Sequence, residues 1–194
     1  MRFDSTRQAI HDALAWGYLK RESGLTEYLT YLCKIDKSGT TRDNCVDMLE
    51  AGYILAAISK LPPHIQSWIR FGYGYDDSRI IQSVVASYIR FHLWPISEAK
   101  KHERLIAMAK KATEDYRLRV WQNKQMPIIA YCQDMGVNEK NFKRDWGNRL
   151  DQCLDLLKLM DSDGVGRISP VVKALKGQAE VDGKPVGPSV MLDL

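Results

Sequence analysis

The chain has 194 residues, of which 45% are hydrophobic and 27% charged, a composition typical of a foldable globular protein and not of a disordered one. Its formal net charge of +4 indicates polyanion binding only weakly, so the position of the charges matters more than their sum. The N-terminus lacks the apolar core of a secretory signal, and no stretch approaches the ~20 apolar residues that span a bilayer. We therefore expect a cytoplasmic protein that has no membrane partner.

Three helices are predicted before residue 62, because apolar residues recur there at helical spacing. Asp4 or Ser5 can cap the first helix. A second, short helix is expected at about 25–35, and a polar loop that contains glycine at 34–43. The third helix, at about 43–61, has to stop there because the residue before a proline disfavours helical geometry.

Pro62 and Pro63 suit the first turn of a fourth helix, which ends in a Gly-Tyr-Gly element at residues 72–74. A fifth helix, capped by a polar residue at 76–78, carries a wide apolar stripe. The stripe consists of Ile81, Val84, Val85, Tyr88 and Ile89.

Trp94-Pro95 breaks the chain, and Ser97 is expected to cap a long basic helix that runs to about Lys124. Pro127 opens a short helix to Met135, and Gly136 makes a turn. Asn138 then caps a last helix to about Met160. From Ser162 onward, glycine and proline predict a flexible tail, with Gly164 and Gly166 as a helix stop.

The segment 128–150, IIAYCQDMGVNEKNFKRDWGNRL, has the spacing of a helix-turn-helix. Cys132 is the small residue of the first helix, and Gly136 lies at the turn. Four apolar residues surround the bend: Tyr131, Met135, Val137 and Phe142. The pattern departs at Asp145, where an apolar residue is expected and Trp146 follows. An ordinary helical hairpin remains the alternative.

The second helix of this segment exposes side chains that can contact DNA. Lysine and arginine bind phosphate and guanine, and asparagine can pair with adenine. The predicted DNA-binding residues are Asn138, Lys140, Asn141, Lys143, Arg144 and Arg149. Residues 97–149 contain 12 lysines and arginines against 7 aspartates and glutamates, so this segment carries a balance of +5. A basic segment of this kind favours nucleic-acid binding, although four of its lysines (Lys100, Lys101, Lys110 and Lys111) can equally form a solvated face.

The order of the elements resembles a known family. The segment 58–77, ISKLPPHIQSWIRFGYGYDD, looks like the first half of the promoter-reading helical domain of sigma factors. It follows an aromatic start (Trp16-Gly17-Tyr18), a polar loop and the helix DNCVDMLEAGYILAAISKL, and it precedes the helix-turn-helix candidate. This order resembles the late-gene antitermination proteins of lambdoid phages, the Q class, in its sigma-region-4-like branch. In that family the Tyr-Gly element runs almost directly into the helix-turn-helix, whereas here residues 78–125 stand between them.

The resemblance implies a protein that binds double-stranded DNA at a phage late promoter and engages bacterial RNA polymerase with its sigma factor. The protein then promotes read-through of terminators. By position, Lys140, Asn141, Lys143 and Arg144 would contact the DNA. Trp68, Arg70 and Tyr73 would face polymerase or sigma.

No enzymatic, metal or cofactor site is predicted. The segment 161–172 resembles the start of a calcium loop, but Val165 and Val172 stand where oxygen ligands are required. The four histidines lack metal-binding spacing, and no cysteine pair has it either. Because the four cysteines mostly lie in apolar patterns, they are expected to be free thiols.

The sequence thus predicts an all-α fold in four segments. These are an N-terminal helical part (1–77), an inserted helical arm (78–125), a helix-turn-helix with a long last helix (126–161) and a flexible C-terminal tail (162–194). Two other functions stay open. One is a conventional helix-turn-helix repressor or activator, and the other is a helical adaptor that binds proteins and no DNA. The expected steep loss of DNA affinity with salt would separate the adaptor from the DNA binders.

Overall fold

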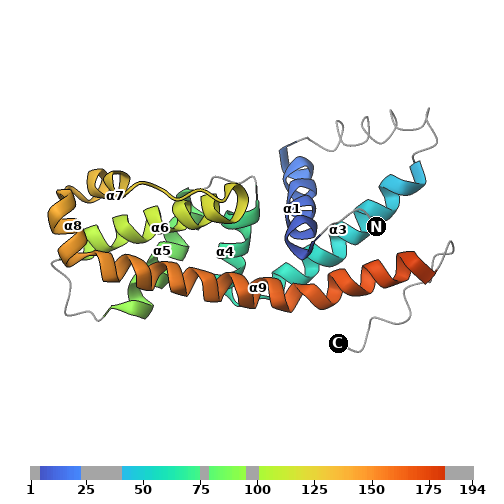
Figure 1. The fold of residues 1–194 in the computed structure, drawn as a ribbon. Helices are drawn as coiled ribbons and strands as arrows, with labels where there is room; N and C mark the ends of the chain where they lie inside the picture. Colours follow the sequence, from blue (N-terminus) through green and yellow to red (C-terminus); the bar gives the residue numbers. More distant parts are fainter. Residues whose placement is uncertain (1–4, 23–40, 75–78, 95–100, 182–194) are drawn as a thin grey trace. The chain divides into compact units, whose positions relative to one another are not determined.

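The computed structural model describes residues 5–22, 41–74, 79–94 and 101–181, and over these residues the chain is all-α, with no strand (Figure 1). The expected helix at 25–35 and the loop before residue 41 lie outside the described residues, as do the caps expected at 76–78 and at Ser97. Two compact units are found. Unit 1 comprises residues 1–57 and 165–194, and unit 2 comprises residues 58–164.

Unit 1 contains α1 (Thr6–Glu22), α3 (Thr41–Ser59) as far as residue 57, and the second half of α9 (Gly147–Val181). Ser5 caps α1, because its hydroxyl accepts a hydrogen bond from the Gln8 amide at 3.2 Å. Ala9, Ile10 and Ala13 form the buried side of this helix. The Thr6 hydroxyl donates to Ser169 on α9 at 3.5 Å.

Helix α3 has large apolar residues on two faces and buries only one of them. Leu49 and Tyr53 are 66% and 40% exposed, whereas Ala51 and Ile54 are buried. The apolar residues of this helix are distributed over most of its sides, so their periodicity alone does not select the face that packs.

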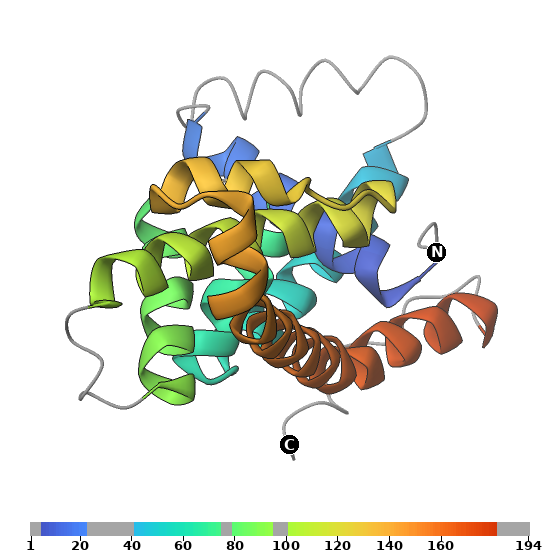
Figure 2. The ribbon, with the colours of Figure 1, turned by 60° about the vertical axis from the view of Figure 1, so that its left-hand side comes forward.

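Unit 2 contains α4 (Pro63–Tyr73), α5 (Arg79–Leu93), α6 (His102–Gln122), α7 (Ile128–Met135), α8 (Glu139–Asp145) and the first half of α9. Helix α5 packs on α4 and α6, and α7 packs along α6 (Figures 1 and 2). The helices of residues 78–125 therefore lie inside this unit. Helix α6 begins at His102, one turn later than expected, and the first side chain that it buries is Leu105.

The proline-initiated helix is confirmed. Pro62 occupies the N-cap position of α4 with Pro63 as its first residue, and the helix ends at Tyr73. A buried carboxylate on α9 links that helix to α4. Asp161 accepts hydrogen bonds from the Tyr73 hydroxyl at 2.6 Å and from the Trp68 indole at 3.2 Å. The segment 161–172 lies within α9, and its first residue, Asp161, is buried in the core.

The single last helix expected from Asn138 to about Met160 is divided into α8 and α9. Its expected end is also wrong, because α9 continues to Val181 through Gly164, Gly166 and Pro170. Gly164 is a contact point and not a stop, since a Cβ there would lie 2.9 Å from the side chains of Ile65 and Ile69 on α4. Beyond it, buried Ile168, Val172 and Leu175 continue the helical stripe. Burial of this stripe outweighs the low helix propensity of the two glycines and the proline. The flexible tail is thus not observed over residues 162–181, and residues 182–194 lie outside the described part.

Two of the cysteines are described. Cys132 and Cys153 are free and buried, as expected. Burial raises the pKa of the Cys132 thiol, and it raises the pKa of Cys153 to about 12. Both side chains therefore stay protonated at neutral pH and pack as small apolar groups.

Candidate nucleic-acid interface

Two short helices, α7 and α8, are joined by a turn of three residues, Gly136 to Asn138. Gly136 has φ +62°, a left-handed conformation that a glycine adopts without steric cost. The turn closes when the Val137 amide donates to the Cys132 carbonyl at 3.1 Å. Asn138 then caps α8, since its side-chain oxygen accepts from the Asn141 amide at 2.8 Å. The sequence predicted both the glycine turn and the asparagine cap.

The inner side of the pair is apolar. Tyr131, Cys132 and Met135 of α7 and Phe142 of α8 are buried, and the Tyr131 and Phe142 rings lie 5.8 Å apart. Asp145 is exposed where an apolar residue was expected. Trp146, one position later, is only 5% exposed and ends α8. The burial of Trp146 replaces the missing apolar contact, so α8 is short and α9 starts at Gly147.

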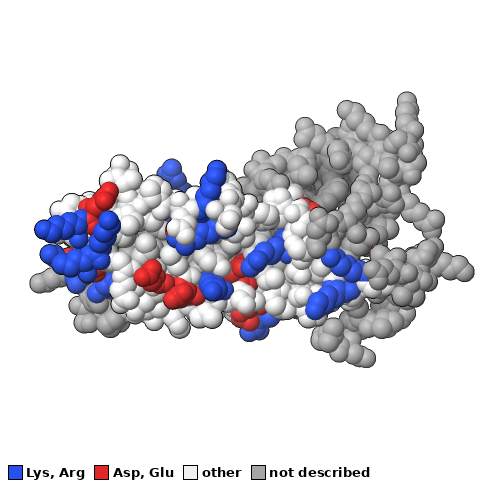
Figure 3. All heavy atoms as spheres, viewed as in Figure 1, with Lys and Arg blue, Asp and Glu red and all other residues white. Residues whose placement is uncertain are grey.

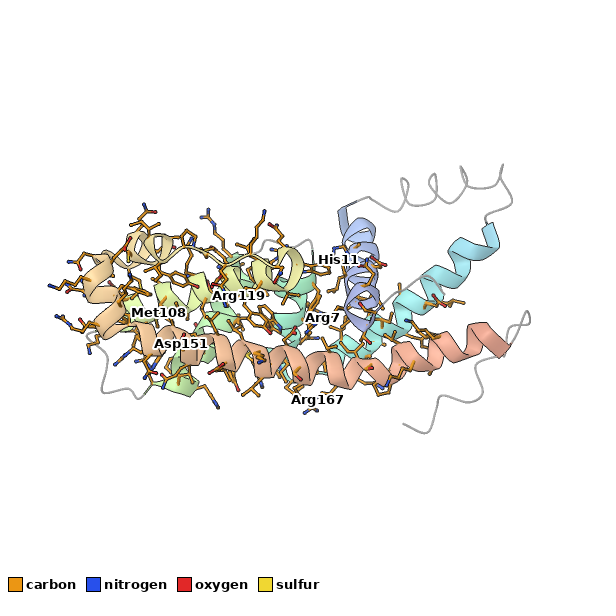
Figure 4. The ribbon with its side chains drawn as sticks, in the orientation of Figure 1. Arg7, His11, Met108, Arg119, Asp151 and Arg167 are labelled. Carbon is orange, nitrogen blue, oxygen red and sulfur yellow. The ribbon has the colours of Figure 1, made fainter. Side chains whose placement is uncertain are left out.

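A buried carboxylate of α6 fixes α7 and the linker that precedes it. Asp115 Oδ2 accepts hydrogen bonds from the Tyr131 hydroxyl at 2.8 Å and from Arg119 Nη2 at 2.8 Å. Its Oδ1 accepts from the Met126 amide at 2.7 Å. Burial, followed by the nearby Asp115 charge, raises the pKa of Tyr131, so this hydroxyl remains a donor. Arg119, labelled in Figure 4, has a half-buried side chain that compensates the Asp115 charge.

The outer side of α8 is basic. Lys140, Lys143 and Arg144 are exposed, and their spacing places Lys140 and Arg144 opposite the buried Phe142. Figure 3 shows lysine and arginine side chains gathered at the end of the unit where α8 lies. Among the described residues, neither Lys140 nor Lys143 has a carboxylate at salt-bridge distance. We call Lys140, Lys143 and Arg144 the basic face of α8.

Arg144 forms an ion pair with its neighbour. Its Nε donates to Asp145 Oδ1 at 2.7 Å, and its Nη2 donates to Asp145 Oδ2 at 2.9 Å. These hydrogen bonds lower the pKa of Asp145 and raise that of Arg144. Asp145 is therefore ionised at neutral pH and holds the guanidinium by one edge.

The other predicted DNA-binding residues occupy different positions. Asn138 is exposed, but its side chain serves as the cap. Asn141 and Arg149 are half-buried. The Arg149 guanidinium lies 5.5 Å from the centre of the Trp146 ring and 6.0 Å from that of Trp94. Arg149 thus packs on the Trp94 and Trp146 rings by cation–π contacts and is not part of the basic face.

The residues expected to face polymerase or sigma are mostly in the core. Trp68 is 0% and Tyr73 is 1% exposed, so their side chains cannot contact a partner in this conformation. This corrects the expectation for both residues, and the reason is their shared hydrogen bonds to Asp161 on α9. Arg70 is half-exposed, and its role as a partner contact remains a prediction.

Much of the positive charge in residues 97–149 has intramolecular partners. Lys111 pairs with Glu114 at 3.1 Å and with Asp134 of α7 at 3.0 Å. Arg117 donates to the Gly74 carbonyl at 3.1 Å. These contacts tie α6 to α7 and to the end of α4. Lys101, Arg104 and Lys124 are exposed as well, so α8 carries only part of the exposed positive charge of this segment.

Sequence reasoning missed Asp115 and the packing role of Trp146. The available signal for Asp115 was its position on the apolar side of the long helix, because an aspartate that is buried there needs partners. Its partners, at residues 126 and 131, only become adjacent when α7 folds back on α6.

The geometry defines an all-α protein that presents a short basic helix on a fixed helix pair. Residues 48–181 match the family described as Phage antitermination protein Q, and the chain belongs to this family. The match covers more than half of the chain, including all of unit 2, and the family assigns it to phage transcription antitermination, a regulatory role. No curated protein and no solved structure matches the chain significantly.

The described residues contain no group of three or more potential metal ligands close enough to hold an ion. Within the same part of the chain, no helix combines the length and apolar character that a membrane span needs.

Proposed function

We propose that this protein is a DNA-binding antitermination factor, which binds at a phage late promoter through the basic face of α8 and engages RNA polymerase there. The observation that supports the proposal is that α8 exposes Lys140, Lys143 and Arg144 on a helix pair held by Asp115, in a member of the antitermination family. In this interpretation α7 and α8 act as a helix-turn-helix, with α8 in the major groove.

Each basic residue has a stated role in the proposal. Lys140 and Lys143 neutralise phosphates, which supplies affinity that does not depend on sequence. Arg144 can donate bidentately to a base or to a phosphate. Asn138 and Arg149 act indirectly, Asn138 as the cap of α8 and Arg149 by packing on Trp146. Asn141 is half-buried beside the basic face and is a secondary base contact.

A binding experiment tests the DNA interaction. The full chain is titrated against a labelled duplex from the late promoter upstream region of its phage, at several salt concentrations. We expect log affinity to fall linearly with log salt, with a slope of about −0.9 for each phosphate neutralised. Lys140→Ala and Lys143→Ala should each make the slope shallower by about one unit. Lys158→Ala, on an exposed position of α9, is the matched control and should leave the slope unchanged.

A transcription experiment tests the antitermination step. The template carries the late promoter followed by a terminator, and purified polymerase with sigma factor is supplied. Added protein should raise read-through only when the upstream promoter region is present, and Lys143→Ala should weaken this effect. Altered initiation with unchanged read-through would instead support a conventional repressor or activator. DNA-independent effects would support the adaptor function.

A further inference from the structure

We propose that Asp145 positions Arg144 so that its guanidinium presents its outer edge to the O6 and N7 atoms of a guanine. This inference rests on the proposed function, because it assumes that α8 lies in the major groove. It starts from the residue that departs from the helix-turn-helix pattern, the exposed Asp145 at a position where an apolar side chain was expected.

The two hydrogen bonds to Asp145 leave one edge of the guanidinium available. Asp145 binds the inner edge, through Nε at 2.7 Å and Nη2 at 2.9 Å. The planar guanidinium carries further N–H groups on Nη1 and Nη2, which point away from this edge as a parallel pair. Such a pair matches the O6 and N7 acceptors of guanine, and this is the commonest base-specific contact of arginine.

Fixing the side chain in this way favours recognition of one base over mobile contact with the backbone. A free arginine loses rotamer entropy when it binds, whereas Arg144 already has its guanidinium plane set by the carboxylate. The backbone at Asp145 is fixed as well, because the adjacent Trp146 is buried and its amide donates to the Phe142 carbonyl at 2.8 Å.

Electrostatics alone predicts the opposite effect for this aspartate. A carboxylate on a surface that binds DNA repels the phosphates, so its removal should tighten binding to every sequence. If Asp145 positions Arg144, its removal should instead weaken binding where the guanine is present. The sign of the effect therefore separates a positioning residue from a bystander charge.

The experiment uses the full chain and a library of randomised double-stranded DNA. Bound duplexes are selected and sequenced, and the preferred duplex is then resynthesised with single guanines replaced. Replacement by 7-deazaguanine removes N7, whereas inosine keeps both O6 and N7 and serves as the control base. At one position, the wild-type protein should lose roughly tenfold in affinity with 7-deazaguanine and little with inosine. Arg144→Ala should bind both duplexes equally at that position.

Asp145→Asn is compared with Glu139→Gln, which also removes one exposed negative charge from α8. We expect Asp145→Asn to lose roughly tenfold on the preferred duplex and most of its sensitivity to 7-deazaguanine, while its affinity for a scrambled duplex stays equal or rises. Glu139→Gln should affect both duplexes alike. Because both sites are exposed, an unchanged circular dichroism spectrum is expected for both variants.

Two results would overturn the inference. One is tighter binding of Asp145→Asn to both duplexes, and the other is undiminished 7-deazaguanine sensitivity in Arg144→Ala. The proposed function fails separately, if the wild-type protein selects no sequence and binds no duplex at low salt. Binding that depends on Lys140 and Lys143, combined with either overturning result, would keep the proposed function and reject this role of Asp145.

Discussion

At the scale of single residues, buried carboxylates hold unit 2 together. Asp115 joins α6 to α7 and to the linker between them, and Asp161 joins α9 to α4, which is distant in sequence. Burial of an aspartate is unfavourable without partners, so these residues specify which helices meet. The position of α8 follows from the same contacts, because α7 precedes it by a fixed turn.

Asp115→Asn should destabilise the protein by about 3 kcal/mol, because the amide removes the charge beside Arg119 and has only one acceptor oxygen. That oxygen can accept from the Met126 amide or from Arg119 and the Tyr131 hydroxyl, but not from both sides. The partial exposure of Arg119 keeps the cost at the lower end of the range for buried pairs. The midpoint of urea unfolding measures the loss, with Asp155→Asn on the exposed side of α9 as the control. Equal midpoints for the two variants would contradict the structural role of Asp115.

At the scale of helices, glycines decide where the chain turns and where helices approach. Gly136 makes the turn before α8 with a left-handed backbone. Gly164 allows α9 to contact Ile65 and Ile69 of α4, and Gly166, with open space around it, does neither. The same residue type thus ends one helix and continues another, and the surroundings decide which.

Alanine substitutions at these three glycines should therefore change the free energy of unfolding differently: two should lower it, and one should raise it. Gly136→Ala should cost roughly 1 kcal/mol, because alanine is strained at positive φ. Gly164→Ala should cost about 1–3 kcal/mol, since its methyl group would overlap the α4 side chains. Gly166→Ala should stabilise by up to about 1 kcal/mol, because it raises helix propensity without a clash. Thermal unfolding of the three variants checks the order, and a destabilised Gly166→Ala would show that α9 is not helical there.

At the scale of the whole molecule, the basic helix pair lies in a unit with its own core. The core of unit 2 draws on α4, α5, α6, α7, α8 and the first half of α9. Its largest buried side chains include Trp68, Tyr131, Phe142, Leu105 and Met108. A unit with its own hydrophobic core can fold alone. DNA binding is accordingly expected to reside in residues 58–164, with unit 1 available for other contacts.

A protein truncated to residues 58–164 should unfold cooperatively and bind the late-promoter duplex with the salt slope of the full chain. The expectation follows from the position of the basic face, all of which lies in unit 2. Circular dichroism and the salt titration described above measure the two properties. A folded fragment with a much shallower slope would place phosphate contacts in unit 1.

The sequence by itself determined the helical class and most helix boundaries in unit 2. Pro62 and Pro63, Gly136 and Asn138 act through local geometry and local hydrogen bonds, so their effects can be read from the chain. The basic face was predictable for a similar reason, since helical spacing alone sets Lys140 and Arg144 opposite Phe142. The family resemblance rested on the order of these same elements.

Only the tertiary structure decided the rest. It buried Trp68 and Tyr73 against Asp161, although aromatic residues at such positions suit a surface or a core equally well. It also continued α9 through Gly164 and Pro170, because burial of Ile168, Val172 and Leu175 outweighs helix propensity. It paired Asp115 with residues of a helix that folds back onto α6. The physical reason is common to all three: each depends on free energy gained between different helices that pack together, which local spacing within one helix does not encode.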